Sequence, residues 1–467
     1  MRRSPKLALA SALFLVFFNT SLLVAQTATT PPPSNSQAAA PPAVEGNVMI
    51  EELQSPNAGT RAKAARELGK AQDVSGLPAL AEALADPSDK VRREVVLALA
   101  QMHQPEVLDA LIKATRDNNE EISVLALQSL VGFYTGNVPT PGFSGFLKKN
   151  WQRAKGHFNP DTTRIDPGVY VDPKVVAALD AALKSTRSIH VSCEAAKGLG
   201  ILIARAAVPD LVAAAHSSDE TLSLESLNAL SKIKDRSAGP QLVDLLDSPD
   251  KEITQQASVA VGILRASQAE PKLQQIYENG ADPKSEEKAM EGLAYLGDKA
   301  SVPVFTKALG SIDKEIRTSA AEGLARARDP KALPDLEKAY AIEKDAGARL
   351  ALVFAMSALG KSDYLNDLVS ELSSRTQWDV AQPYLIELAR TPGFLPRLYP
   401  YLQSSSADVR KRLCTVLMFG GDQTSMDQLD RLSHDPNSDV AAQALQAKSG
   451  LRARLATEGT NGGTNSP

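Results

Sequence analysis

Apolar side chains recur at steps of three and four residues along most of the chain, which is the pattern of amphipathic helices. In residues 76–100, one apolar stripe runs from Leu77 to Leu84 and a second runs from Val91 to Leu99. A short turn rich in Asp, Pro and Ser separates the two stripes. The segment therefore predicts a pair of helices joined by a tight turn.

The same pair of stripes repeats along the chain, and the first apolar residue of each second helix serves as an anchor for the register. Thr60, Val91 and Ile122 follow one another at intervals of 31 residues, and most later intervals are close to this value. One helical pair cannot bury its own apolar stripe, whereas stacked pairs share a continuous core. The pattern predicts an all-α fold, an α-solenoid of stacked helical pairs. The anchors are Thr60, Val91, Ile122, Val191, Leu222, Ile253, Ser285, Ile316, Ala351, Val380, Val409 and Val440.

Residues that begin or end helices follow the same register. Proline is tolerated in the first turn of a helix, because its missing N–H would be unpaired there. Glycine suits the left-handed residue after a helix, and aspartate suits the N-cap. We expect proline at the start of first helices, glycine just past second helices and aspartate just before them. The prolines are Pro78, Pro209, Pro240, Pro303 and Pro334; the glycines are Gly69, Gly200, Gly297 and Gly360; the aspartates are Asp89, Asp219, Asp250, Asp313, Asp408 and Asp439.

Several of these segments resemble HEAT repeats. The residues that carry the resemblance are Val91-Arg92 with Ala98-Leu99-Ala100, Ile316-Arg317 with Gly323-Leu324, and Val409-Arg410 with Leu417. The Leu-Pro-x-Leu and Val-Pro-x-Leu openings are similar to those of the shorter repeats in bilin-lyase-like HEAT proteins. The resemblance covers residues 44–131 and 174–456. It implies an armadillo-type, right-handed superhelix, with first helices on the convex side and second helices lining the concave side.

The two ends of the chain differ from the repeats. Residues 1–26 place Arg2, Arg3 and Lys6 before a long apolar run, which is the pattern of a signal peptide. We expect an exported protein of a bacterial cell, periplasmic or secreted, although an uncleaved anchor is the alternative for this run. Residues 27–43 are rich in Pro, Thr and Ala and predict a disordered linker, and residues 457–467 predict a disordered tail.

One insertion interrupts the register, because Ile122 and Val191 are 69 residues apart. Residues 132–173 combine aromatic and basic side chains with several prolines. Aromatic and Arg side chains are common anchors of protein interfaces. The alternative is that these aromatic side chains pack back onto the solenoid and fill its groove. The candidate partner-binding residues are Phe143, Phe146, Lys148, Lys149, Trp151, Arg153, Phe158 and Tyr170.

Arginine follows the anchor in four repeats, at Arg61, Arg92, Arg317 and Arg410. These side chains would either grip an acidic partner or form a structural ladder with the neighbouring turns. The repeated position favours the structural ladder, because each repeat contacts only its neighbours.

Chemistry for catalysis is sparse in the sequence. None of the five histidines is followed by Glu, although HEAT-type deoxyhypusine hydroxylases bind iron through His-Glu dipeptides. We therefore expect no metal and no cofactor. Cys193 and Cys414 are far apart in an elongated array, which favours two small buried hydrophobic residues over a disulfide.

The function that follows is a non-catalytic scaffold of the bacterial cell envelope. It would bind a protein through the concave helix face, the aromatic insertion or both. The net charge of −4 gives no broad field for nucleic acid, and no second apolar run predicts stable membrane insertion after the leader. The alternative is a bilin-lyase-like enzyme or an enzyme-maturation factor, in which Cys193 would supply a thiol.

Overall fold

The computed structural model describes residues 42–136, 164–165, 169–185, 187–279 and 282–460. Residues from Gly46 onward form one compact unit, and the description below concerns that unit. Its described residues form helices joined by turns and include no strand. The predicted leader lies outside the described residues. Among the described helices, none combines the length and the apolar character that a membrane crossing requires.

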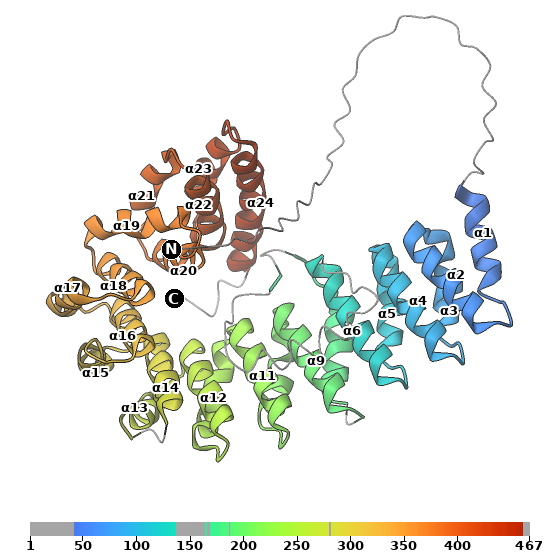
Figure 1. Ribbon diagram of the computed structural model, residues 1–467, viewed down its shortest axis with the longest axis horizontal. Coiled ribbons are helices and arrows are strands. Elements are labelled where there is room, and N and C mark those ends of the chain that lie inside the picture. The colour runs from blue at the N-terminus through green and yellow to red at the C-terminus, as the bar shows by residue number, and fades with distance from the viewer. Residues whose placement is uncertain (1–41, 137–163, 166–168, 186, 280–281, 461–467) are drawn as a thin grey trace, which may run out of the picture. The chain divides into compact units, whose positions relative to one another are not determined.

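The helices alternate between a first and a second helix of each repeat (Figure 1). A preceding helix, α1, covers Pro42–Glu52. The second helices are α2 (Ala58–Ala71), α4 (Asp89–Met102), α6 (Glu120–Thr135), α9 (Ile189–Ile201), α11 (Glu220–Ile233), α12 (Lys251–Ile263), α14 (Pro283–Leu296), α16 (Lys314–Ala327), α18 (Ala346–Ala358), α20 (Trp378–Ala389), α22 (Ala407–Gly420) and α24 (Ser438–Thr460).

The first helices are shorter, and most follow a single 3-10 turn. They are α3 (Leu77–Ala83), α5 (Leu108–Ala114), α8 (Pro173–Leu183), α10 (Val208–Ala215), α13 (Glu270–Asn279), α15 (Val302–Ala308), α17 (Leu333–Ile342), α19 (Leu365–Ser370), α21 (Leu395–Leu398) and α23 (Ser425–Leu432). One first helix is 3-10 throughout, namely η5 (Arg236–Asp247).

Second helices pack on one another in sequence order, from α2 on α4 to α22 on α24. The first helices pack on the second helices of their own repeats, so that the repeats form two layers (Figure 1); in the repeat of α22, the 3-10 helix η11 (Tyr399–Gln403), which continues α21, makes this contact. The insertion leaves this order intact, because α6 and α9 contact each other directly. The prediction of an all-α solenoid is confirmed.

One position on the second helices carries the core from repeat to repeat. It lies eight residues after the anchor, and its side chain is at most 1% exposed in eleven repeats. Burying one such side chain stabilises the fold by about 1.5–3 kcal/mol. The residues of this seam are Leu68, Leu99, Leu130, Leu199, Leu230, Val261, Leu293, Leu324, Met356, Leu388 and Leu417.

The start of α18 shows that one predicted anchor is wrong. In α18 the third residue is Ala348, as Val91 is the third residue of α4, so the anchor is Ala348 and Ala351 is wrong by three positions. Asp345 fixes this start, because its side chain accepts from the N–H groups of Gly347 and Ala348 at 3.0 and 3.1 Å. The anchor was misplaced because the residues after Arg349 form an unbroken apolar run, in which no polar residue marks the exposed side of the helix.

The predicted aspartate caps are confirmed in half of the cases. Asp219, Asp250 and Asp313 accept hydrogen bonds from the first N–H groups of α11, α12 and α16. The other three aspartates lie inside the first turn, where an acid still favours the positive end of the helix dipole. In those repeats the residue at the cap position is Ser88, Ser406 or Asn437, and of these Ser406 and Asn437 accept N–H bonds. The three misassigned aspartates are Asp89, Asp408 and Asp439.

Glycine has two roles at the second helices rather than the single role predicted. Gly297 and Gly360 take left-handed conformations at the ends of α14 and α18, as expected. Gly69 and Gly200 instead lie inside α2 and α9. A Cβ atom at Gly69 would approach Cα of Ala98 to 2.5 Å, so these two glycines allow neighbouring second helices to pack closely.

The predicted prolines lie at the start of first helices in four of five cases, in α3, α10, α15 and α17. The exception is Pro240, which lies inside the 3-10 helix η5. At the two ends, α1 begins at Pro42 within the predicted linker, and α24 continues to Thr460 within the predicted tail.

Candidate partner-binding site

Most of the predicted partner-binding residues lie outside the described part of the chain. They are Phe143, Phe146, Lys148, Lys149, Trp151, Arg153 and Phe158. The remaining one, Tyr170, is 79% exposed. It lies just before α8, and because its side chain is exposed it is accessible to a partner.

The described end of the insertion is fixed to the repeats. The N–H of Ile165 donates to the carbonyl of Ile201 at 3.1 Å, and the N–H of Asp172 donates to the Tyr134 hydroxyl at 3.1 Å. Ile165 and Val171 pack against the core. Ile165, Val171 and Asp172 therefore pack onto the solenoid, as the alternative interpretation of the insertion predicts. Tyr170 does not, because its side chain is exposed.

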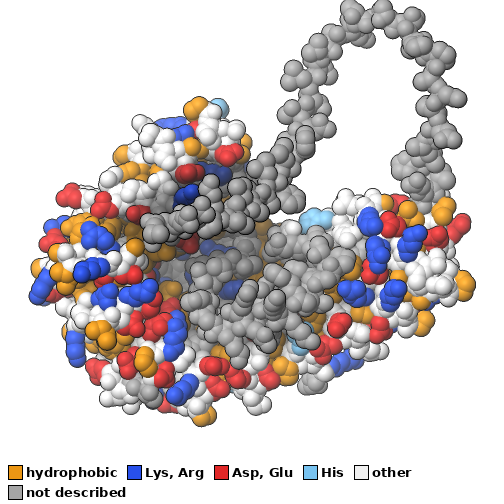
Figure 2. Space-filling view, in the orientation of Figure 1, with side chains coloured by type: hydrophobic (Ala, Val, Ile, Leu, Met, Phe, Trp, Pro, Cys, Tyr) orange, Lys and Arg blue, Asp and Glu red, His pale blue; other side chains and the backbone are white. Residues whose placement is uncertain are grey.

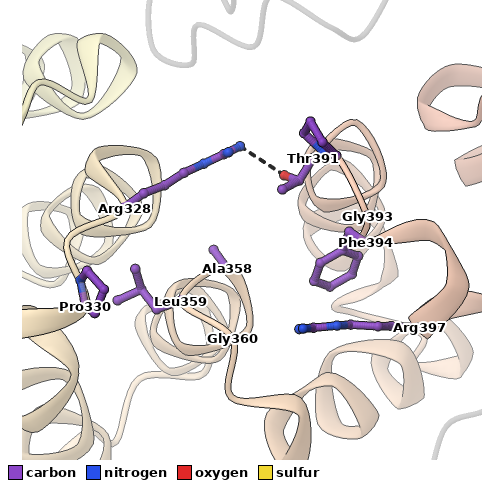
Figure 3. A pocket seen from close by; sticks show the side chains of 10 residues that line it. Arg328, Pro330, Ala358, Leu359, Gly360, Thr391, Gly393, Phe394 and Arg397 are labelled. Atoms are coloured by element: carbon purple, nitrogen blue, oxygen red, sulfur yellow. Dashed lines mark hydrogen bonds between the residues drawn. The ribbon is translucent and has the colours of Figure 1, made fainter.

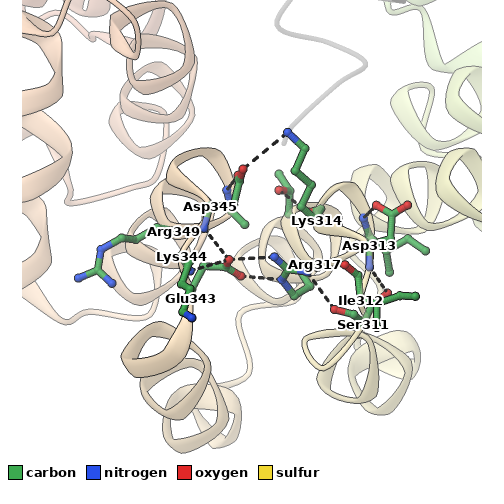
Figure 4. A network of polar contacts seen from close by, with 12 residues as sticks. Ser311, Ile312, Asp313, Lys314, Arg317, Glu343, Lys344, Asp345 and Arg349 are labelled. Atoms are coloured by element: carbon green, nitrogen blue, oxygen red, sulfur yellow. Dashed lines mark hydrogen bonds and ion pairs between the residues drawn. The ribbon is translucent and has the colours of Figure 1, made fainter. Parts of the chain in front are cut away.

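The arginines that follow the anchors form a structural ladder, as predicted. The guanidinium of Arg317 donates to both carboxylate oxygens of Glu343 at 2.6 and 2.9 Å, and to the carbonyl of Ser311 at 3.0 Å (Figure 4). Each ladder arginine thus joins its own turn to the turn of the next repeat. The other pairs are Arg61 with Asp86, Arg92 with Asp117, and Arg410 with Asp435.

Hydrogen bonding lowers the pKa of the ladder carboxyl group of Glu343. The bonds from Arg317 are the main cause that lowers the pKa of Glu343 to about 2, and the N–H of Asp345 contributes. In other repeats a hydroxyl replaces arginine and closes the same turn. Ser223 donates to the carbonyl of Ala215 at 2.6 Å, and Thr254 donates to that of Ser248 at 3.1 Å. These positions are therefore occupied by structural contacts.

A second set of charged residues gathers where α16 faces α20. The guanidinium of Arg326 donates to Glu387 at 2.8 and 3.0 Å and to Glu322 at 3.1 Å. The Tyr384 hydroxyl donates to the other oxygen of Glu322 at 2.5 Å. The side chain of Arg326 is only 8% exposed. The repeat pattern of the sequence did not predict this cluster, which we call the Arg326 cluster.

A pocket of about 260 Å³ opens next to the Arg326 cluster (Figure 3). Its walls are the ends of α16 and α18 and the turn between α20 and α21. Arg328 enters from the end of α16 and donates to the Thr391 hydroxyl at 3.0 Å, and Arg397 enters from α21. A smaller pocket of about 60 Å³, lined by Arg265 and Glu387 among others, shares Arg328 and Thr391. We call the larger space the Arg328 pocket.

The cysteines give no sign of reactivity. Cys193 and Cys414 are buried and unpaired, which confirms their interpretation as small core residues. Burial raises the pKa of each thiol to about 12, so both stay protonated at neutral pH. Within the described residues, no three His, Cys, Asp or Glu side chains are placed to hold a metal ion.

A family model described as HEAT repeats matches residues 46–131, 172–261 and 270–357. An engineered protein of known structure is similar at 18% identity, over 87% of this chain and 99% of its own, with a TM-score of 0.37. Kap95p, which binds RanGDP, is similar at 14% identity over 88% of this chain and 56% of its own, with a TM-score of 0.42. Human deoxyhypusine hydroxylase is similar at 21% identity over 54% of this chain and 84% of its own, with a TM-score of 0.26.

No curated protein matches the chain. The family assignment therefore rests on the repeats themselves, which pack in sequence order as helical pairs. Because the matched repeats cover more than half of its residues, the chain belongs to the HEAT-repeat family.

Proposed function

We propose that the chain is a non-catalytic scaffold of a bacterial cell envelope that binds another protein through its second helices. The observation that carries the proposal is the Arg328 pocket beside the Arg326 cluster. There, side chains from α16, α18 and α20 meet around an open space instead of closing a turn. Convergent polar groups beside an apolar pocket are typical of binding sites.

The surface charge supports a protein partner over a nucleic acid. Acidic and basic side chains are interspersed over the face in view in Figure 2. The net charge of the whole chain is −4. Nucleic-acid binding depends instead on a concentrated basic surface. The leader pattern of residues 1–26 is what supports export to the envelope.

The bilin-lyase-like alternative has less support. A thiol that acts as a nucleophile must ionise, and burial raises the pKa of Cys193 and of Cys414 to about 12. No catalytic role is proposed for either residue.

Site-specific photo-crosslinking of the full chain in its native cells tests the proposal. A photoreactive residue replaces Gln256, which is half-buried on α12, and in a matched chain it replaces Lys338, which is exposed on the first helix α17. We expect a discrete crosslinked protein from position 256 and none from position 338. Equal crosslinking from both layers, or crosslinking from position 338 alone, would contradict binding through the second helices.

A further inference from the structure

We propose that the Arg328 pocket binds a carboxylate of an acidic peptide segment of the partner protein, held by Arg328 and Arg397. This inference rests on the proposed function, because it names the chemistry by which the scaffold recognises its partner. It concerns the Arg328 pocket at the ends of α16 and α18 and the start of α21, which is separate from the arginine ladder at the starts of the second helices.

The two arginines face one space from opposite walls. In Figure 3 the side chain of Arg328 extends from the end of α16 toward Thr391, and that of Arg397 extends beneath Phe394 toward Gly360. The Arg397 guanidinium lies 5.5 Å from the centre of the Phe394 ring, which holds it against the pocket wall. Guanidinium groups on two walls suit an oxyanion between them, since each offers a planar set of donors.

Around the Arg328 pocket, arginine side chains outnumber the carboxylates that could pair with them. Glu387 and Glu322 are both bound to Arg326. Among the described residues, Arg265, Arg328 and Arg397 each lack a carboxylate within 4.0 Å. The nearby acid Asp329 accepts the N–H of Lys331 in the following turn. The fold thus leaves cations without anions beside an open pocket.

The state of Arg265 agrees with this excess. Although Arg265 is exposed as a residue, the protein around its guanidinium displaces enough water to lower its pKa, and the charge of Arg326 lowers it further. The guanidinium donates to the carbonyl of Leu296 at 2.6 Å, which is a neutral partner. Neighbouring cations that repel one another gain most from an anion that enters between them.

The rest of the lining suits a peptide better than a free inorganic anion. Ala358, Leu359, Pro330 and Phe394 give the Arg328 pocket an apolar floor. At about 260 Å³, the pocket has room for a carboxylate and an apolar neighbour. Inorganic phosphate would leave this apolar floor unused, whereas an acidic side chain next to an aliphatic one would fill both parts.

Helix electrostatics explain only part of the arrangement. Arg328 follows α16, where a cation favours the negative end of the helix dipole. Arg397 belongs to the four-residue helix α21, which has no comparable dipole to satisfy. The convergence of both side chains on one space needs a further reason, and a bound carboxylate supplies it.

The test is a fluorescence-anisotropy titration of the full chain with a labelled, end-blocked peptide, Leu-Asp-Leu, and with its neutral counterpart, Leu-Asn-Leu. We expect binding of the Asp peptide to weaken about 10-fold or more in Arg328→Gln and in Arg397→Gln. The matched control is Lys234→Gln, because Lys234 takes the same left-handed position at the end of α11 (φ 57°) as Arg328 does (φ 52°). Binding by the control should equal that of the unchanged chain.

Three results would overturn the inference. They are no binding of the Asp peptide, equal binding of the Asn peptide, and displacement of the Asp peptide by inorganic phosphate at a similar concentration. The crosslinking experiment keeps the two proposals apart. If the peptide fails but position 256 still crosslinks to a protein, the carboxylate pocket is wrong and the scaffold stands. If position 256 gives no crosslink, the scaffold itself is wrong.

Discussion

Two groups of arginines in this chain differ in whether a carboxylate of the fold binds them. The ladder arginines, such as Arg317, lie near the starts of second helices and hydrogen-bond to the turns of their own repeat and of the next one. Arg328, just past the second helix α16, and Arg397, in the first helix α21, have no carboxylate partner among the described residues. The same residue type therefore serves the fold in one region and remains available to a ligand in the other.

In the Arg326 cluster, beside the Arg328 pocket, the arginine is paired with two carboxylates. Its removal should have the largest effect on stability of the changes considered. Replacing Arg326 with Ala leaves Glu322 and Glu387 facing each other without their cation, and the expected loss is about 2–3 kcal/mol. This expected loss is smaller than that for a fully buried pair because the Glu387 side chain is 37% exposed. Denaturant unfolding followed by circular dichroism measures it. The exposed Lys331→Ala variant is the control, and equal midpoints for the two variants would show that the cluster adds no stability.

A ladder carboxylate should contribute less, and its contribution should depend on pH. Hydrogen bonds from Arg317 lower the pKa of Glu343 to about 2 in the folded state, so its stabilisation is complete above its ordinary pKa and is lost as the pH falls toward 2. Glu343→Gln should cost about 1–2 kcal/mol at pH 7 and almost nothing near pH 2. Unfolding midpoints from pH 7 to pH 2 provide the measurement.

The control for this pH series is Glu315→Gln, an exposed glutamate of α16 whose change should alter neither the midpoint nor its slope with pH. A Glu343→Gln profile parallel to that of the unchanged chain would mean that the ladder pair does not couple folding to pH.

A smaller effect, of opposite sign, is expected at the end of α9. Ile203 has a left-handed backbone (φ 52°), which is costly for a β-branched residue. Asn adopts this conformation more readily, so Ile203→Asn should raise stability by about 0.5–1 kcal/mol. The matched change Lys234→Asn should gain less, because Lys is not β-branched. A loss of stability in Ile203→Asn would mean that the isoleucine side chain matters more than its backbone strain.

The repeats could be predicted from the sequence because their signal is local and recurs. Except for the 69-residue step across the insertion, the seam from Leu68 to Leu417 repeats every 29–32 residues, so an error at one anchor, as at Ala351, leaves its neighbours correct. Structural ladder pairs were also within reach, since Arg92 and Asp117 lie one repeat apart.

The Arg326 cluster could not be predicted in this way. Arg326 and Glu387 are 61 residues apart, so their contact passes over the intervening helix α18. That contact depends on how far α16 and α20 approach each other, which the spacing of apolar residues does not encode. A clue did exist in the sequence, because Arg326 and Arg328 end a second helix with two cations. Only the structure shows that one is paired and the other is not.

Arg328 differs most from the ladder arginines, because its replacement should leave the stability almost unchanged. Gln can occupy the same left-handed position, and no carboxylate loses its partner when the arginine is removed. Arg328→Gln should therefore change the free energy of unfolding by less than about 0.5 kcal/mol, as for an ordinary surface substitution. Denaturant unfolding beside Arg317→Gln, which should lose about 1–2 kcal/mol, is the measurement. A loss at Arg328 equal to that at Arg317 would place both arginines in the fold and remove the reason for a ligand.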